Sequence, residues 1–120
     1  MLEELQRMKN RVTWSWNGVI HVYRTEGSFM QWLIANAVFG VLAFVLPLDW
    51  GVRGALLMGG VVILAMECMN TAIERVVDDV SVETRDAARQ AKDAGSAAVA
   101  VAAVAAGIGW ICAIVGVMMG

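Results

Sequence analysis

The sequence predicts an all-α membrane protein with three transmembrane helices per protomer. An N-terminal amphipathic surface helix precedes them, in a single membrane-embedded domain over residues 1–120. Two observations predict this fold. Hydrophobic residues make up 59% of the chain and charged residues only 17%, which is too apolar for an ordinary soluble domain. The chain also contains three long apolar runs, and a spanning helix needs about 20 mostly apolar residues.

The N-terminal segment, about residues 2–25, has mixed polarity and a helical repeat of apolar positions. Spacings of three and four, typical of one helix face, separate Leu5, Met8, Val12, Trp16, Val19 and Val22. Trp14, Trp16 and Tyr23 are residue types that prefer the headgroup zone. We therefore expect this helix to lie on the membrane surface before the chain turns inward near "TEGS".

The three spans are expected at about residues 29–48, 54–74 and 94–118. The third is dominated by alanine and glycine, which allow neighbouring helices to approach closely. Because three short spans bury little surface, we expect a homo-oligomer in which helices of neighbouring chains complete the bundle.

Lysine and arginine indicate the orientation, since cytoplasmic segments carry an excess of both. The basic residues cluster before the first span and in the link between the second and third, at Arg7, Lys9, Arg11, Arg24, Arg75, Arg85, Arg89 and Lys92. The N-terminus and the link at 75–93 are therefore predicted to be cytoplasmic, with the turn at 49–53 and the C-terminus outside.

The sequence predicts neither a binding role for its two cysteines nor a nucleic-acid partner. Cys68 and Cys112 fall in apolar stretches and are interpreted as small buried hydrophobes, with no metal and no disulfide. No basic run suggests nucleic-acid binding.

A polar stripe interrupts the second apolar run. At about 100° per residue, Glu67, Asn70, Glu74 and Asp78 fall within an arc of roughly 80° on one helix face. Ionisable groups at membrane depth usually face a cavity or a partner. The deeper, desolvated carboxylate suits a general base, and one near the cytoplasmic water can ligate Mg²⁺. The alternative is that these groups only join helices by hydrogen bonds, which for Asn70 alone is equally plausible.

A second cluster, "AKDAGSAA", opens the third span. Lys92 and Ser96 share a helix face, Gly95 leaves room for backbone approach, and the helix N-terminus favours an anion such as phosphate. A snorkelling lysine at an ordinary helix start would look the same. Glu26 is a third acid at this level, although its spacing fits a solvated boundary residue equally well. No GxxxxGK(S/T) motif, kinase-type glycine-rich loop, HRD or DFG occurs, so a phosphoryl transfer here would not use the familiar soluble folds.

Several motifs resemble the small integral-membrane diacylglycerol kinases of bacteria. They are "MECMNTAIERVVDD" and "AKDAGSAAV", with "WSWNG" and "EGSFMQ" upstream. The resemblance implies a homotrimer with active sites between protomers, in the bacterial cytoplasmic (inner) membrane with a cytoplasmic N-terminus. It implies Mg²⁺ and ATP-dependent phosphorylation of diacylglycerol to phosphatidic acid at the cytoplasmic face.

The resemblance also implies roles for individual residues. Glu67 would take the proton from the lipid hydroxyl, and Glu26 and Glu74 would hold Mg²⁺ ions that bridge the ATP phosphates. Nucleotide contacts are implied for Arg7, Glu26, Asn70, Glu74, Asp78, Glu83, Lys92 and Asp93. Contacts to the lipid substrate are implied for Arg7, Ser15, Trp16, Gln31, Glu67, Ser96 and Trp110.

The chain departs from the family pattern near the first span. Where the family often has "EAAFRQE", this chain reads "EGSFMQW", so Met30 replaces a basic residue and Trp32 an acidic one. Trp14 stands where a tyrosine is common. These changes affect polar contacts and leave the implied chemical path intact.

Three other functions fit parts of the sequence. Undecaprenol kinase belongs to another branch of the same family, whose motif tends to read K-D-x-A-A-G-A, so "KDAGSAA" favours diacylglycerol. A non-catalytic membrane assembly module would use the carboxylates to pair with lysine between helices. A small proton- or cation-conducting oligomer would need acids at depth but not the pocket at Lys92 and Ser96.

Overall fold

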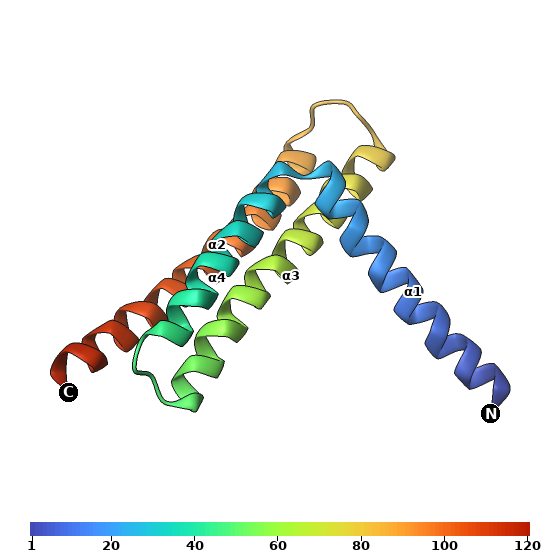
Figure 1. Ribbon diagram of the computed structural model, residues 1–120. Helices are drawn as coiled ribbons and strands as arrows, with labels where there is room; N and C mark the ends of the chain where they lie inside the picture. Colours follow the sequence, from blue (N-terminus) through green and yellow to red (C-terminus); the bar gives the residue numbers. More distant parts are fainter.

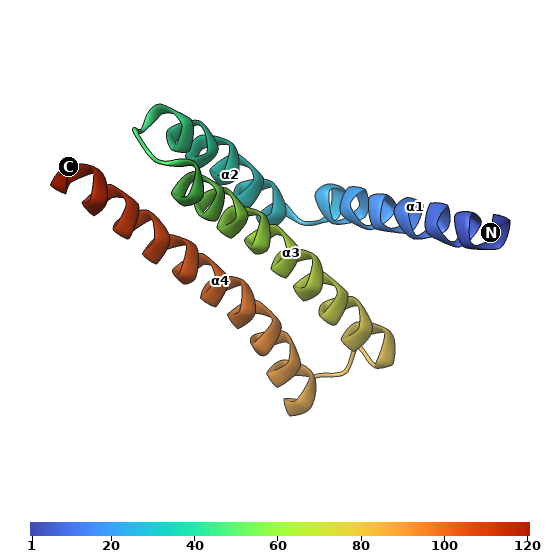
Figure 2. The same ribbon diagram turned by 90° about the horizontal axis from the view of Figure 1, so that it is seen from below.

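A computed structural model describes residues 1–120 and contains four helices: α1 (Leu2–Thr25), α2 (Gly27–Val45), α3 (Trp50–Val80) and α4 (Asp86–Met119). Helices α2, α3 and α4 run side by side, whereas α1 leaves this bundle at a steep angle (Figures 1 and 2). Helix α3 packs against both α2 and α4. The three bundle helices are long and apolar enough to cross a membrane, which confirms the all-α class and the number of candidate spans.

Local chemistry explains where the helices begin and end. Glu26 has extended backbone dihedral angles (φ −115°, ψ 109°) and separates α1 from α2. Helix α2 ends at Val45 because Leu46 precedes Pro47, and the residue before a proline avoids the helical region. Asp49 then caps α3 by accepting a hydrogen bond from the backbone N–H of Val52 at 3.0 Å.

The bounds of the bundle helices differ from the expected spans, and two connections are shorter or shifted. The link expected at 75–93 is reduced to residues 81–85, and the turn expected at 49–53 lies at 46–49. With 31 residues, α3 is about 47 Å long, whereas a bilayer core is about 30 Å thick. The charged sequence next to the link therefore continues both helices beyond the apolar layer, because charge ends a membrane span without ending a helix.

The interior of a single chain is small. Only 10 of 120 residues are buried, and two of them, Glu67 and Thr71, are polar residues of α3. A groove of about 980 Å³ also lies between α3 and α4 near their ends furthest from the 81–85 link, with mostly small apolar residues along it. Cys68 is partly buried, but Cys112 is exposed in this groove. The expected burial of Cys112 is thus not found within one chain.

Candidate active site

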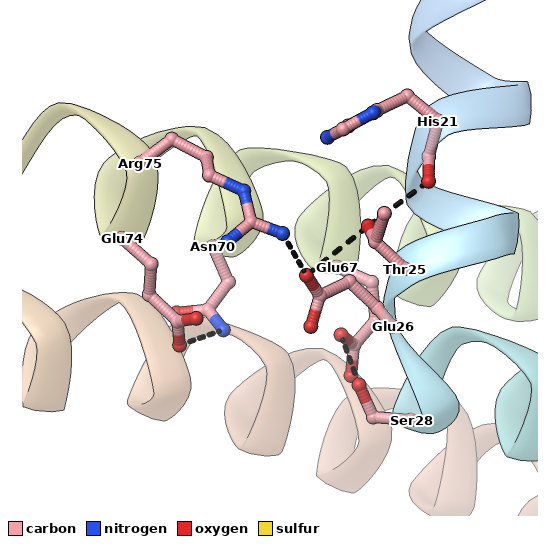
Figure 3. Close-up of polar contacts among 8 residues, drawn as sticks. All are labelled: His21, Thr25, Glu26, Ser28, Glu67, Asn70, Glu74 and Arg75. Carbon is pink, nitrogen blue, oxygen red and sulfur yellow. Dashed lines mark hydrogen bonds and ion pairs between the residues drawn. The ribbon is translucent and has the colours of Figure 1, made fainter. Parts of the chain in front are cut away.

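Glu67 lies on α3 where that helix meets the start of α2. Only 5% of the surface of Glu67 is accessible to solvent. Its Oε2 accepts a hydrogen bond of 3.0 Å from the hydroxyl of Ser28 (Figure 3). No other hydrogen bond or ion pair within the chain reaches this carboxylate. A buried carboxylate with one oxygen free of hydrogen bonds within the chain can serve as a general base.

Asn70 and Glu74 continue the stripe along α3. Asn70 Nδ2 donates to Glu74 Oε1 at 3.1 Å (Figure 3). Asn70 Oδ1 is the one buried side-chain polar atom without a hydrogen-bond partner. It faces Gly95 of α4, where a Cβ atom would lie 2.5 Å away. A buried acceptor without a donor is costly, so the position of this oxygen depends on the other contacts of the Asn70 side chain.

Glu26 occupies the break between α1 and α2. Arg75 of α3 donates to Glu26 Oε1 at 2.7 Å, and the hydroxyl of Thr25 lies 3.3 Å from the same oxygen (Figure 3). Three helices therefore meet at this carboxylate. The sequence indicates Arg75 only as a cytoplasmic charge, because its pairing with a residue 49 positions away leaves no local signal.

The remaining charged candidates meet around the 81–85 link. Lys92 Nζ lies 2.7 Å from Asp78 Oδ1 and joins the ends of α3 and α4. Arg89 contacts Asp93 at 3.1 Å. A cavity of about 280 Å³ at this place is lined by Val77, Asp78, Ser81, Val82, Glu83, Thr84, Arg85, Ala88, Arg89, Lys92 and Asp93. Mixed charges around an open cavity suit a polyanion that is bound together with cations.

Within a single chain, no hydrogen bond or ion pair joins the implied lipid-contacting residues to Glu67. Arg7 is on the distant half of α1 and pairs with Glu4 at 3.3 Å. Ser15 and Trp16 are exposed on the same helix, which projects away from the bundle (Figure 2). Gln31 and Ser96 are exposed on α2 and α4. Trp110 instead contacts Phe39, with ring centroids 5.1 Å apart, in an apolar pocket that Trp32 also lines.

Comparison with known proteins places these residues in a family. A family model described as prokaryotic diacylglycerol kinase matches residues 13–114. The chain belongs to the prokaryotic diacylglycerol kinase family. The match covers every candidate residue except Arg7, so all of the α3 stripe and the link lie within it. Membership and three candidate spans together indicate a multi-pass membrane protein.

Relatives from several bacteria are similar over most of their length. Diacylglycerol kinase of Pseudomonas aeruginosa is 34% identical over 112 residues, which cover 93% of this chain and 91% of that protein. Diacylglycerol kinase of Escherichia coli K12 is 35% identical over 97 residues, covering 81% and 80%. Diacylglycerol kinase of Haemophilus influenzae is 29% identical over 107 residues, covering 88% and 90%.

The stripe of this diacylglycerol kinase family member offers the donor atoms that Mg²⁺ prefers. Mg²⁺ is usually held by one or two carboxylates together with substrate phosphates and water, so a protein cage is not required. No group of three or more possible ligands among histidine, cysteine, aspartate and glutamate gathers within the chain. Glu74 on α3 and Glu26 at the α1–α2 break are the carboxylates that could hold the ion, although Glu26 is paired with Arg75 within one chain.

Proposed function

We propose that the protein is a lipid kinase that transfers the γ-phosphoryl group of ATP to the hydroxyl of diacylglycerol, forming phosphatidic acid. The observation that carries this proposal is the buried Glu67 on a candidate span, with Glu74 about two turns further toward the polar link. Family membership and relatives named diacylglycerol kinase support the same activity. A base at depth and charged groups above it fit a substrate whose hydroxyl stays in the membrane while the nucleotide stays in water.

The reaction assigns a simple task to Glu67. Its free carboxylate oxygen takes the proton of the lipid hydroxyl as that oxygen bonds to the γ-phosphorus of ATP. The bond between this phosphorus and the bridging oxygen breaks, and ADP leaves. Phosphoryl transfer needs mainly positioning and charge neutralisation, which Mg²⁺ supplies when bound.

The other candidate residues are assigned to binding the metal ion, the nucleotide or the lipid. Glu26 and Glu74 would hold Mg²⁺, while Asn70 and Asp78 support that site. Glu83, Lys92 and Asp93 would contact the nucleotide at the 280 Å³ cavity. Arg7 would meet phosphate or a headgroup. The lipid side would comprise Ser15, Trp16, Gln31, Ser96 and Trp110.

A homotrimer is part of the proposal. Within one chain, the α1 candidates stay away from Glu67, little surface is buried, and the groove between α3 and α4 is open. A neighbouring copy that filled the groove could also bring its residues to the site. We further propose that α1 lies on the cytoplasmic surface of the inner membrane, as the basic residues near the α1–α2 break and the link suggest.

The test is transfer of labelled phosphate from ATP, with Mg²⁺, to diacylglycerol and to undecaprenol in parallel. Glu67→Gln is the matched variant, since its amide oxygen can still accept the hydrogen bond from Ser28. We expect label on diacylglycerol and at least about 100-fold less with Glu67→Gln. Label on undecaprenol alone would move the protein to the other branch of the family. Label on neither would contradict the kinase function and favour a non-catalytic assembly.

A further inference from the structure

The hydroxyl of Ser28 is the one hydrogen-bond donor that the chain supplies to the Glu67 carboxylate. Ser28 is the second residue of α2, next to the break at Glu26, and Glu67 is in the middle of α3. The bond therefore connects two helices at the candidate base (Figure 3). In the family pattern "EAAFRQE" this position is an alanine, so the motif gives the residue no role.

The bond distinguishes the two oxygens of Glu67. Oε2 accepts from Ser28, and Oε1 has no partner within the chain. Asn70 Oδ1 is the only buried side-chain oxygen or nitrogen that lacks a partner, so Oε1 keeps some access to its surroundings. Access at one oxygen and a fixed bond at the other leave a single oxygen for the proton of a substrate.

We propose that Ser28 is a positioning residue that fixes the Glu67 carboxylate so that Oε1 receives the proton of the lipid hydroxyl. The inference deepens the proposed kinase function and rests on Glu67 as its base. A glutamate side chain has three rotatable bonds, and catalysis needs the base within hydrogen-bond reach of the proton it takes. The 3.0 Å bond to an adjacent helix disfavours the rotamers that turn the carboxylate away.

Kinetics provide the first test. Ser28→Ala should lower kcat about 10-fold and leave the KM for ATP unchanged, because the lost bond orients the base and binds no nucleotide. Ser28→Thr keeps the hydroxyl and should retain most of kcat. Thr13→Ala is the matched control, since it removes a hydroxyl that bonds only to the Lys9 carbonyl on α1. An unchanged kcat in Ser28→Ala, with the wild type active, would overturn the positioning role and leave the kinase function intact.

A double-mutant cycle separates positioning from general destabilisation. The shorter side chain of Glu67→Asp withdraws the carboxylate from α2, so adding Ser28→Ala should change kcat by less than about twofold. An equal loss from Ser28→Ala in both backgrounds would show that Ser28 acts independently of Glu67 and would overturn the inference.

Infrared difference spectroscopy provides a readout that does not depend on turnover. The band of the Glu67 carboxyl group is the one that Glu67→Gln removes, and Ser28→Ala should shift it while Thr13→Ala does not. An unshifted band would overturn the hydrogen bond itself. If Ser28→Ala shifts the band but the wild-type protein phosphorylates no lipid, the hydrogen bond stands and the proposed function is overturned. The role of the bond in catalysis is then overturned with it.

Discussion

The side-chain oxygen of Asn70 on α3 faces Gly95 on α4 so closely that a Cβ on residue 95 would lie 2.5 Å from it. Gly95 is therefore required for the approach of the two helices at the polar stripe. The side chain of Asn70 cannot turn away freely, since its Nδ2 donates to Glu74. Packing between α3 and α4 and the geometry of the candidate site are thus linked at one glycine.

Gly95→Ala should lower the free energy of unfolding by about 1–3 kcal/mol, because the added methyl group overpacks this contact. It should also raise the Mg²⁺ concentration needed for half-maximal activity by disturbing Asn70 and Glu74. Thermal unfolding in detergent and a Mg²⁺ titration measure the two effects. Gly107→Ala is the control on the same helix, since nothing lies within 4 Å of its Cβ position. Equal melting temperatures for the two variants would contradict the contact.

Glu74→Gln should raise the Mg²⁺ concentration for half-maximal activity at least about 10-fold. The glutamine oxygen can still accept from Asn70, so the variant removes a charge and keeps the hydrogen bond. The measurement is turnover against Mg²⁺ at saturating ATP. Glu3→Gln, at an exposed position of α1, provides the control. An unchanged titration in Glu74→Gln would remove Glu74 as a ligand.

Arg75→Gln should lower the Mg²⁺ concentration for half-maximal activity, because Arg75 competes with the metal for Glu26. The ion pair is short, at 2.7 Å, but the Arg75 side chain is 52% exposed. A pair of this exposure contributes up to about 1 kcal/mol, so the expected decrease is at most about fivefold. A Mg²⁺ titration beside wild type decides the matter, and a higher requirement in the variant would mean that Arg75 assists the site.

Arg53→Lys should destabilise the turn between α2 and α3 by about 1 to 2 kcal/mol. Arg53 Nε donates to the Ala43 carbonyl at 2.8 Å, and its guanidinium lies 4.5 Å from the Trp50 ring centroid. A lysine ammonium cannot reproduce both contacts. Thermal unfolding measures the loss. Arg11→Lys, at an arginine of α1 without an ion pair, should leave the melting temperature unchanged, and equal losses would contradict a specific role for Arg53.

The register of the polar stripe could be predicted from the sequence. Glu67, Asn70 and Glu74 lie on one face because the helical period alone sets their angles. The helix ends were less predictable. The charged residues predict a link from residue 75, but α3 continues to Val80 because charge ends a membrane span without ending the helix.

The sequence by itself determined the all-α class, the three apolar spans and the order of the acids along α3, since composition and helical period are local properties of the chain. Only the tertiary structure decided which groups meet across helices. Ser28 and Glu67 are 39 residues apart, and Glu26 and Arg75 are 49 apart. Such pairs depend on the angle and depth at which helices pack, and no local pattern encodes either.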